Sequence, residues 1–168
     1  MGKHTHDDGA GADAYLLVDG KKQGAVKGEA STPGHEEEIT VKAWHWGVTS
    51  PTAVGTSHAT GRRVYQVLRI DKHVDASSTK LMNALASNEE LKKVSLGLRK
   101  AGTDEDFFTI VLEQARVVGC EIQSEQNGAL NEVVSIAYQV IDITYHSQKD
   151  SGDRGASTSF SDSFNVQT

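Results

Sequence analysis

Short runs in which apolar and polar residues alternate recur along most of the chain, and this period of two predicts β-strands. The cleanest alternation lies in residues 93–99, where Val94, Leu96 and Leu98 are separated by polar residues or glycine. Further strands are predicted at residues 15–18, 39–42, 63–74, 107–122 and 134–145, and a last short one at 160–166. The chain is therefore expected to be mainly β.

Several of these strands change face along their length. Ile39 and Val41 share one face, whereas the next large apolar residues, Trp44 and Trp46, fall on the other. In residues 107–122, polar side chains interrupt an apolar face that otherwise continues, so this run is one long bent strand or two abutting ones. The members of that face are Phe108, Ile110, Leu112, Val118, Cys120 and Ile122. The changes of parity within residues 39–46 and again within residues 134–145 predict β-bulges or burial on both faces.

One segment has helical character. Its apolar stripe consists of Leu81, Met82 and Leu85. Ser77 or Ser78 is placed to accept the free N–H groups of a first turn, and Ser87–Asn88 ends the pattern. A helix is therefore predicted over about Ser78–Ser87. The expected fold is a small antiparallel β-barrel or a two-sheet sandwich with this one short α-helix.

The chain is organised as a tail and one domain. Residues 1–13 are polar and Gly-rich, which predicts a flexible N-terminal tail, and residues 14–168 are expected to form a single domain with a polar C-terminal segment. Two long polar segments, residues 20–37 and 48–62, are predicted as surface loops. Loops of this length in a compact domain are usually functional or mobile.

Composition and charge exclude several classes. Across 168 residues, 17 Lys and Arg oppose 23 Asp and Glu, giving a formal charge of −6 with the basic residues scattered. This balance argues against binding nucleic acid or an anionic membrane. No stretch approaches the roughly 18 apolar residues of a membrane helix, and the N-terminus lacks the apolar segment of an export signal. Folding is expected in the cytoplasm. The single cysteine, Cys120, is predicted to be a core thiol.

The sequence predicts no enzymatic activity, no cofactor and no metal site. The strand-to-helix junction at residues 75–80 lacks the glycines of a nucleotide-binding loop. His4 and His6 lie in the predicted tail, where a fixed metal site is not expected. His73 with Asp71 and Asp75 is interpreted as capping and surface pairing. No set of residues supplies a nucleophile with its base.

Aromatic residues suggest an alternative to be weighed. Trp44 and Trp46 could form a stacking platform for a sugar, which would make the protein a monomeric carbohydrate- or ligand-binding β-sandwich. Packing against the core is the favoured interpretation for both, and likewise for Tyr138 and Tyr145.

A series of short motifs is more specific. Its parts are Val26-Lys27-Gly28-Glu29, His35, Glu38-Ile39, Ala43-Trp44-His45-Trp46-Gly47, Lys72-His73-Val74-Asp75, Ser78, Leu81, Leu98-Arg99-Lys100-Ala101-Gly102, Glu132-Val133-Val134, Tyr145-His146-Ser147-Gln148-Lys149 and Gly152. In this order and spacing they resemble the haemolysin-coregulated protein (Hcp) family, the tube protein of type VI secretion. The resemblance spans about residues 14–166.

The resemblance implies a structural, secreted protein. Hexameric rings of the family stack into a hollow tube that a contractile sheath expels, and the lumen holds small effector proteins. The implied partners are further copies of this chain, the spike and sheath proteins, and effectors. Assembly in the cytoplasm and export without a signal peptide follow from the same resemblance.

The resemblance also suggests roles for individual residues. His45 stands where the family commonly has a small residue facing the lumen, and Thr79 stands where Pro is often found. Both long loops, at residues 20–37 and 48–62, are predicted to contact the next ring because they are polar and adaptable. Individual residues are assigned to this contact in the loop at residues 48–62. Its predicted stacking residues are Thr49, Ser50, Thr52, Ser57, His58 and Thr60.

Overall fold

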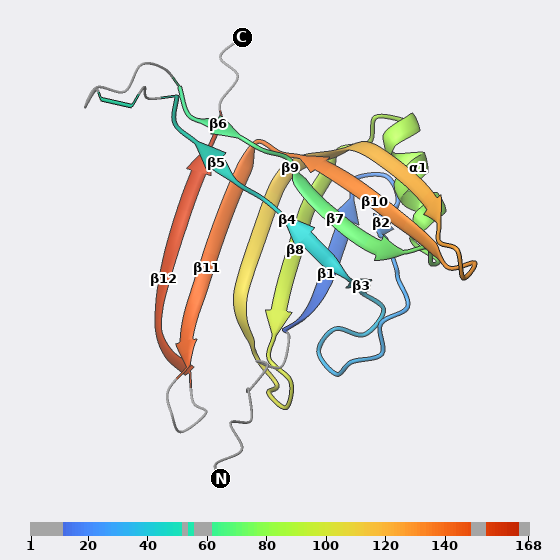
Figure 1. Cartoon of the computed structure of the whole chain (residues 1–168), viewed down its shortest axis with the longest axis horizontal. Coiled ribbons are helices and arrows are strands. Elements are labelled where there is room, and N and C mark those ends of the chain that lie inside the picture. Colours follow the sequence, from blue (N-terminus) through green and yellow to red (C-terminus); the bar gives the residue numbers. More distant parts are fainter. Residues whose placement is uncertain (1–11, 52–53, 56–61, 149–153, 165–168) are drawn as a thin grey trace.

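Antiparallel strands and one helix make up the described part of the chain, residues 12–51, 54–55, 62–148 and 154–164, in a computed structural model (Figure 1). In chain order the elements are β1 (Asp13–Gly20), β2 (Gly24–Ala25), β3 (Ile39–Val41), β4 (Ala43–His45), β5 (Val48–Thr49), β6 (Val64–Tyr65), β7 (Leu68–His73), α1 (Ser78–Ala86), β8 (Leu91–Arg99), β9 (Asp106–Ser124), β10 (Leu130–Ala137), β11 (Val140–Gln148) and β12 (Arg154–Ser163). The mainly β prediction with one helix is confirmed. Residues 1–11 of the predicted tail lie outside the described residues.

Strand β9 belongs to two sheets. Its first part pairs with β8 and β11, and its second part pairs with β10. The first sheet has the order β12–β11–β9–β8–β1, and the second sheet has the order β9–β10–β7–β4. In Figure 1 the second sheet crosses in front of the first. The path of paired strands does not close, so the fold is a two-sheet sandwich.

A short segment passes from one sheet to the other. β3 pairs with β1, and β4, one residue further along, pairs with β7. Between them the Lys42 N–H donates to the Asp71 carbonyl over 2.8 Å. This change of sheet explains why Trp44 lies on the opposite parity from Ile39.

The inner faces of the two sheets form one apolar core. From the first sheet, Val94 and Leu96 are fully buried opposite Leu112 and Ile110 of β9, as the alternation predicts. From the second sheet, Ile136 is also fully buried. Burial of such side chains is the main favourable contribution to folding. No helix in the described ranges is long and apolar enough to span a membrane.

The long strand β9 changes face twice. Gln114 has a positive φ of 49°, after which Ala115 and Val117 are buried instead of their even-numbered neighbours. The partner of Ser135 is Gly119 but that of Ile136 is Val117, so Val118 is an extra, bulged residue, 52% exposed. The prediction of one long bent strand is confirmed, whereas the expectation that Val118 lies on the inner face is wrong.

Helix α1 begins and ends close to the predicted residues, but its first turn is capped differently from the prediction. Asn88, with φ 53°, follows the last turn. Neither predicted serine caps the first turn with its side chain: instead the Asp75 carboxylate accepts the Ser77 N–H over 2.9 Å, and Ser78 Oγ accepts the Asp75 N–H over 2.9 Å. The buried apolar residues of the helix are Leu81 and Ala84, while Leu85 is 37% exposed. The predicted stripe is therefore wrong for Leu85.

A buried ionic cluster fastens α1 to the second sheet. Lys72 on β7 and Glu132 on β10 are directly opposite in the ladder and fully buried. Lys72 Nζ donates to Glu132 Oε2 over 2.8 Å and to Ser78 Oγ over 3.0 Å, and it pairs with Asp75 over 3.0 Å. Ser78 Oγ also donates to Glu132 Oε2 over 2.5 Å. His73, which the sequence analysis interprets as a capping and surface-pairing residue, is exposed. The burial of its neighbour Lys72 was not predicted.

Removal of one partner of this buried pair should be strongly destabilising. For Glu132→Leu we expect the free energy of unfolding to fall by roughly 3 kcal/mol, because Lys72 loses its main counter-charge. Lys72→Met with Glu132→Leu should restore most of that loss. Urea unfolding measures both, with Glu121→Gln on the exposed face of β9 as the neutral control. Equal losses in the single and the double variant would contradict this account.

Candidate functional site

Four aromatic side chains gather where the predicted stacking loop joins the sandwich. They are Trp46, Tyr65, Tyr138 and Phe164, called here the aromatic cluster. The Tyr65 and Phe164 rings meet edge to face at 4.5 Å, Trp46 lies 6.3 Å from Tyr65, and Tyr138 lies 6.2 Å from Phe164. These residues follow β4, lie in β6, and follow β10 and β12, respectively, so the cluster joins four segments distant in sequence.

Hydrogen bonds fix the aromatic cluster. Trp46 Nε1 donates to the Tyr138 hydroxyl over 2.6 Å, and that hydroxyl donates to the Gln66 carbonyl over 2.7 Å. The Gln66 N–H donates to the Gly47 carbonyl over 3.0 Å. β5 and β6, which carry the loop, form a small sheet of their own, so these bonds attach it to the sandwich. The loop therefore starts from a rigid base.

One contact links this base to the outermost strand of the first sheet. The Tyr65 hydroxyl donates to the carboxylate of Asp162 on β12. This hydrogen bond raises the pKa of Tyr65 and lowers the pKa of Asp162, which also accepts the Ser163 N–H over 2.8 Å. The loop base and β12 are thus joined through a charge-assisted hydrogen bond.

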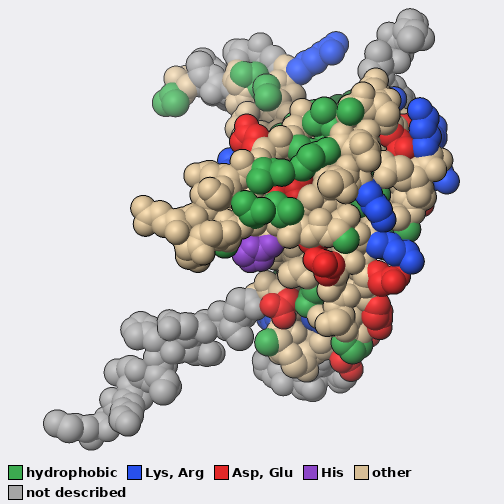
Figure 2. All heavy atoms as spheres, turned by 90° about the vertical axis from the view of Figure 1, so that its right-hand side faces the viewer, with side chains coloured by type: hydrophobic (Ala, Val, Ile, Leu, Met, Phe, Trp, Pro, Cys, Tyr) green, Lys and Arg blue, Asp and Glu red, His purple; other side chains and the backbone are tan. Residues whose placement is uncertain are grey.

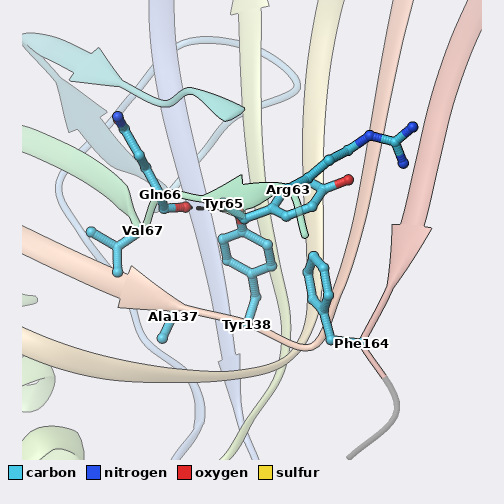
Figure 3. Close-up of a pocket in the computed structure, with 7 residues that line it drawn as sticks. All are labelled: Arg63, Tyr65, Gln66, Val67, Ala137, Tyr138 and Phe164. Carbon is cyan, nitrogen blue, oxygen red and sulfur yellow. Dashed lines mark hydrogen bonds between the residues drawn. The ribbon is translucent and has the colours of Figure 1, made fainter. Parts of the chain in front are cut away.

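An open cavity of about 280 Å³ lies beside the aromatic cluster (Figure 3). Val67 and Ala137 form its apolar side, Tyr65, Tyr138 and Phe164 surround it, and Arg63 supplies a cation at the edge. An apolar floor with a cation at the rim suits a small apolar or acidic group.

Three of the predicted site residues, His45, Thr49 and Ser50, lie within the described part of the chain. Thr49 lies in β5 and Ser50 directly follows it, whereas Thr52, Ser57, His58 and Thr60 lie outside the described residues. His45 is exposed on β4, directly opposite Arg69 of β7. The register continues this row through Ser135 and Gly119, so His45 belongs to the outer face of the second sheet.

The tryptophan platform is not formed. Trp44 stacks on Phe108 at 5.8 Å, both tryptophans are half-buried against the core, and the Trp46 N–H is already hydrogen-bonded. This favours the packing interpretation, which also holds for Tyr138. It is wrong for Tyr145, which is 47% exposed on β11.

The loop at residues 20–37 is more tightly bound than predicted. His35 is buried, stacks on Tyr15 at 4.5 Å, and directs Nε2 to Asp106 Oδ1 at 2.8 Å and Nδ1 to the Glu38 carboxylate. A Cβ at Gly97 would lie 2.4 Å from Asp106 Oδ2, which explains glycine there. No sequence pattern predicts the contact between His35 and Asp106, because these residues are 71 positions apart.

The arrangement is that of a small β protein whose clustered side chains fasten loops and shape surfaces. Within the described ranges no group of three or more His, Cys, Asp or Glu could hold a metal ion. The chain matches the family model described as "Type VI secretion system effector, Hcp" over residues 15–145. It therefore belongs to the Hcp family, whose members are structural proteins of type VI secretion.

Individual relatives agree with this assignment. The "Major exported protein" of Pseudomonas aeruginosa is 34% identical over 117 residues, which cover 62% of this chain and 68% of that protein. The secreted protein Hcp3 from Pseudomonas aeruginosa is 28% identical with a TM-score of 0.69, covering 92% of this chain and 99% of that one. Hcp1 from E. coli EAEC 042 shares the fold, with a TM-score of 0.75, 24% identity and coverages of 90% and 99%.

Loss of the Tyr138 hydroxyl should loosen the loop base. In Tyr138→Phe the Trp46 Nε1–H loses its acceptor, and we expect the free energy of unfolding to fall by about 1–2 kcal/mol. Tryptophan emission should shift to longer wavelength as Trp46 becomes more hydrated. Tyr145→Phe removes a hydroxyl from a half-exposed side chain and serves as the control. Equal effects of the two variants would refute the role given to Tyr138.

The Tyr65–Asp162 contact predicts a pH dependence. Because the folded pKa of Asp162 is lowered, its carboxylate stabilises the fold above the unfolded value of about 4, and this contribution is lost as pH falls through the folded pKa. The raised pKa of Tyr65 contributes below about pH 10 and is lost as pH rises through the folded value. Urea unfolding at pH 7 and about pH 3 should show a smaller acid-induced loss in Tyr65→Phe than in the wild type. An unchanged loss would contradict the coupling.

Proposed function

We propose that this chain is the ring-forming subunit of a type VI secretion tube. Hexameric rings stack into a hollow tube, the contractile sheath expels it, and small effectors travel in the bore. The protein acts through its shape in the assembled state and catalyses no reaction. It assembles in the cytoplasm and leaves through the secretion apparatus, with the spike at the tip of the tube and the sheath around it.

One observation carries the proposal beyond family membership. The two-stranded extension formed by β11 and β12, called here the ribbon, projects beyond the second sheet in Figure 1. Its inner face begins with the buried Ile141 and ends with Tyr145 and Phe160, which are 47% and 44% exposed. This face continues the core without a covering layer. Exposed apolar faces of this kind mark protein–protein contacts.

The outer face of the second sheet is proposed to line the bore. His45, Arg69, Ser135 and Gly119 form one cross-strand row there, and Arg69 pairs with Asp71 over 3.3 Å. Small and polar side chains with both charge signs make a hydrated wall. Effectors in such a bore would be retained by confinement and weak polar contacts. The family position of His45 supports this orientation.

The cavity beside the aromatic cluster favours a second candidate, a monomeric ligand-binding β-sandwich. Its volume of about 280 Å³ is at the lower limit of known ligand sites. Light scattering separates the candidates, because the tube subunit should have the mass of a ring and the ligand-binding module that of one copy. A single-copy particle at high concentration would contradict the proposal.

Shortening the loop at residues 48–62 tests the stacking role. Replacing residues 50–62 with Asn-Gly keeps a turn between β5 and β6 while removing the predicted contact surface. We expect rings to remain and tubes to be lost in negative-stain images. A Gly/Ser segment of the original length is the matched control for the loss of side chains alone. If rings disappear together with tubes while the fold is retained, the stacking role is wrong.

A further inference from the structure

The cavity beside the aromatic cluster has a lining that suits one kind of small ligand. Val67 and Ala137 form its apolar side, and the rings of Tyr65, Tyr138 and Phe164 surround it (Figure 3). Figure 2, a space-filling view of one face, shows that hydrophobic side chains also reach the surface of this molecule among polar ones. A concave, mostly apolar and aromatic lining with few polar groups is the usual composition of a ligand site.

Both hydroxyl groups of the lining are already engaged by the protein. The Tyr138 hydroxyl accepts the Trp46 N–H over 2.6 Å and donates to the Gln66 carbonyl over 2.7 Å. The Tyr65 hydroxyl donates to the Asp162 carboxylate. Neither hydroxyl therefore has a proton to give to a ligand, and the tyrosines offer the surfaces of their rings. Such surfaces favour an aromatic ring, whereas a sugar would leave hydroxyl groups without partners.

Arg63 places a positive charge at the rim of this cavity. Among the described residues that line the cavity it is the charged one, and its side chain is exposed. The pKa of Asp162 is lowered first by the hydrogen bond from Tyr65 and to a smaller extent by the charge of Arg63. A guanidinium carries five N–H donors in a planar fork that matches a carboxylate. The rim therefore favours an acidic group on the ligand.

We propose that this cavity binds a small aromatic carboxylate, with its ring against the apolar side and its acid group on Arg63. The cavity volume of about 280 Å³ limits the ligand to one ring with a short chain, because larger ligands occupy sites of about 300–1,000 Å³. The inference goes beyond the tube function and does not rest on it, since one copy holds the whole cavity. A bound acid would join residues 63–67, at the base of the loop, to the end of β10.

Tryptophan fluorescence can report this binding. Trp44 and Trp46 are the two tryptophans of the chain, and Trp44 stacks on Phe108. Trp44→Phe keeps an aromatic ring there and leaves Trp46, bonded to Tyr138, as the single reporter. We titrate this reporter protein with hydrocinnamate, a phenyl ring on a two-carbon chain that ends in a carboxylate. Trp46 emission should shift to shorter wavelength and saturate with a Kd on the order of 1 mM.

Three further substitutions in the reporter protein locate the ligand. Ala137→Leu fills the apolar side and should abolish the saturable shift. Arg63→Gln should weaken hydrocinnamate about fivefold, the upper part of the contribution of an exposed ion pair, and should leave the affinity for the neutral hydrocinnamide unchanged. Arg62→Gln removes the same charge one residue away, outside the lining, and is the matched control that should bind like the reporter protein.

Each alternative result would overturn the proposal. These results are a shift that does not saturate, an equal affinity for the acid and its amide, and equal losses in Arg63→Gln and Arg62→Gln. Binding that persists in Ala137→Leu would place the ligand elsewhere. If near-ultraviolet circular dichroism shows that Ala137→Leu is unfolded, Val67→Phe fills the same side from a 39% exposed position, and persistent binding there has the same meaning. A single-copy mass in light scattering would refute the tube function alone.

Discussion

The shared strand β9 is the constraint on which the rest of the structure depends. Because one continuous strand pairs with β8 and β11 and then with β10, the two sheets cannot move independently. If this 19-residue strand were regular, Leu112 before Gln114 and Ala115 after it would point to opposite faces. The positive φ at Gln114 and the bulge at Val118 allow it to fill the core in both sheets. The ribbon is the part of the first sheet that extends past this common strand.

Charged and aromatic side chains hold the segments that the backbone hydrogen bonds of the two sheets do not fix. Lys72 and Glu132 hold α1, His35 holds the loop at residues 20–37, and the aromatic cluster holds β5 and β6. Each group joins segments distant in sequence. Buried ion pairs of this kind add little net stability compared with apolar packing, but a partner left alone is costly, so they favour one arrangement of the segments over others. This positional precision suits the proposed role of a subunit that fits against copies of itself.

The sequence predicts the strands well because their alternation reflects burial on one face, as Val94 and Leu96 show. The changes of face at Gln114 and Val118 were not predicted, because the alternation of apolar and polar residues does not show where the backbone of a strand twists or bulges. A signal for the ionic cluster was present: Lys72 shares the parity of Leu68 and Ile70, and Glu132 that of Val134. Two opposite charges on inward positions indicate a buried pair. The environment of His35 had no such signal, because its loop lacks periodicity and Asp106 is far along the chain.

The hydrogen bond between Tyr65 and Asp162 connects the proposed contact within a ring with the proposed contact between rings. Asp162 belongs to the ribbon, whereas Tyr65 lies at the base of the loop that is proposed to contact the next ring. A neighbouring copy that contacts the ribbon would therefore also restrain the base of the loop that contacts the next copy along the tube axis. In a tube built this way, the closing of a ring and the growth of the tube along its axis are mechanically linked within each subunit. A completed ring then offers the next ring a stiffer surface than a single copy does.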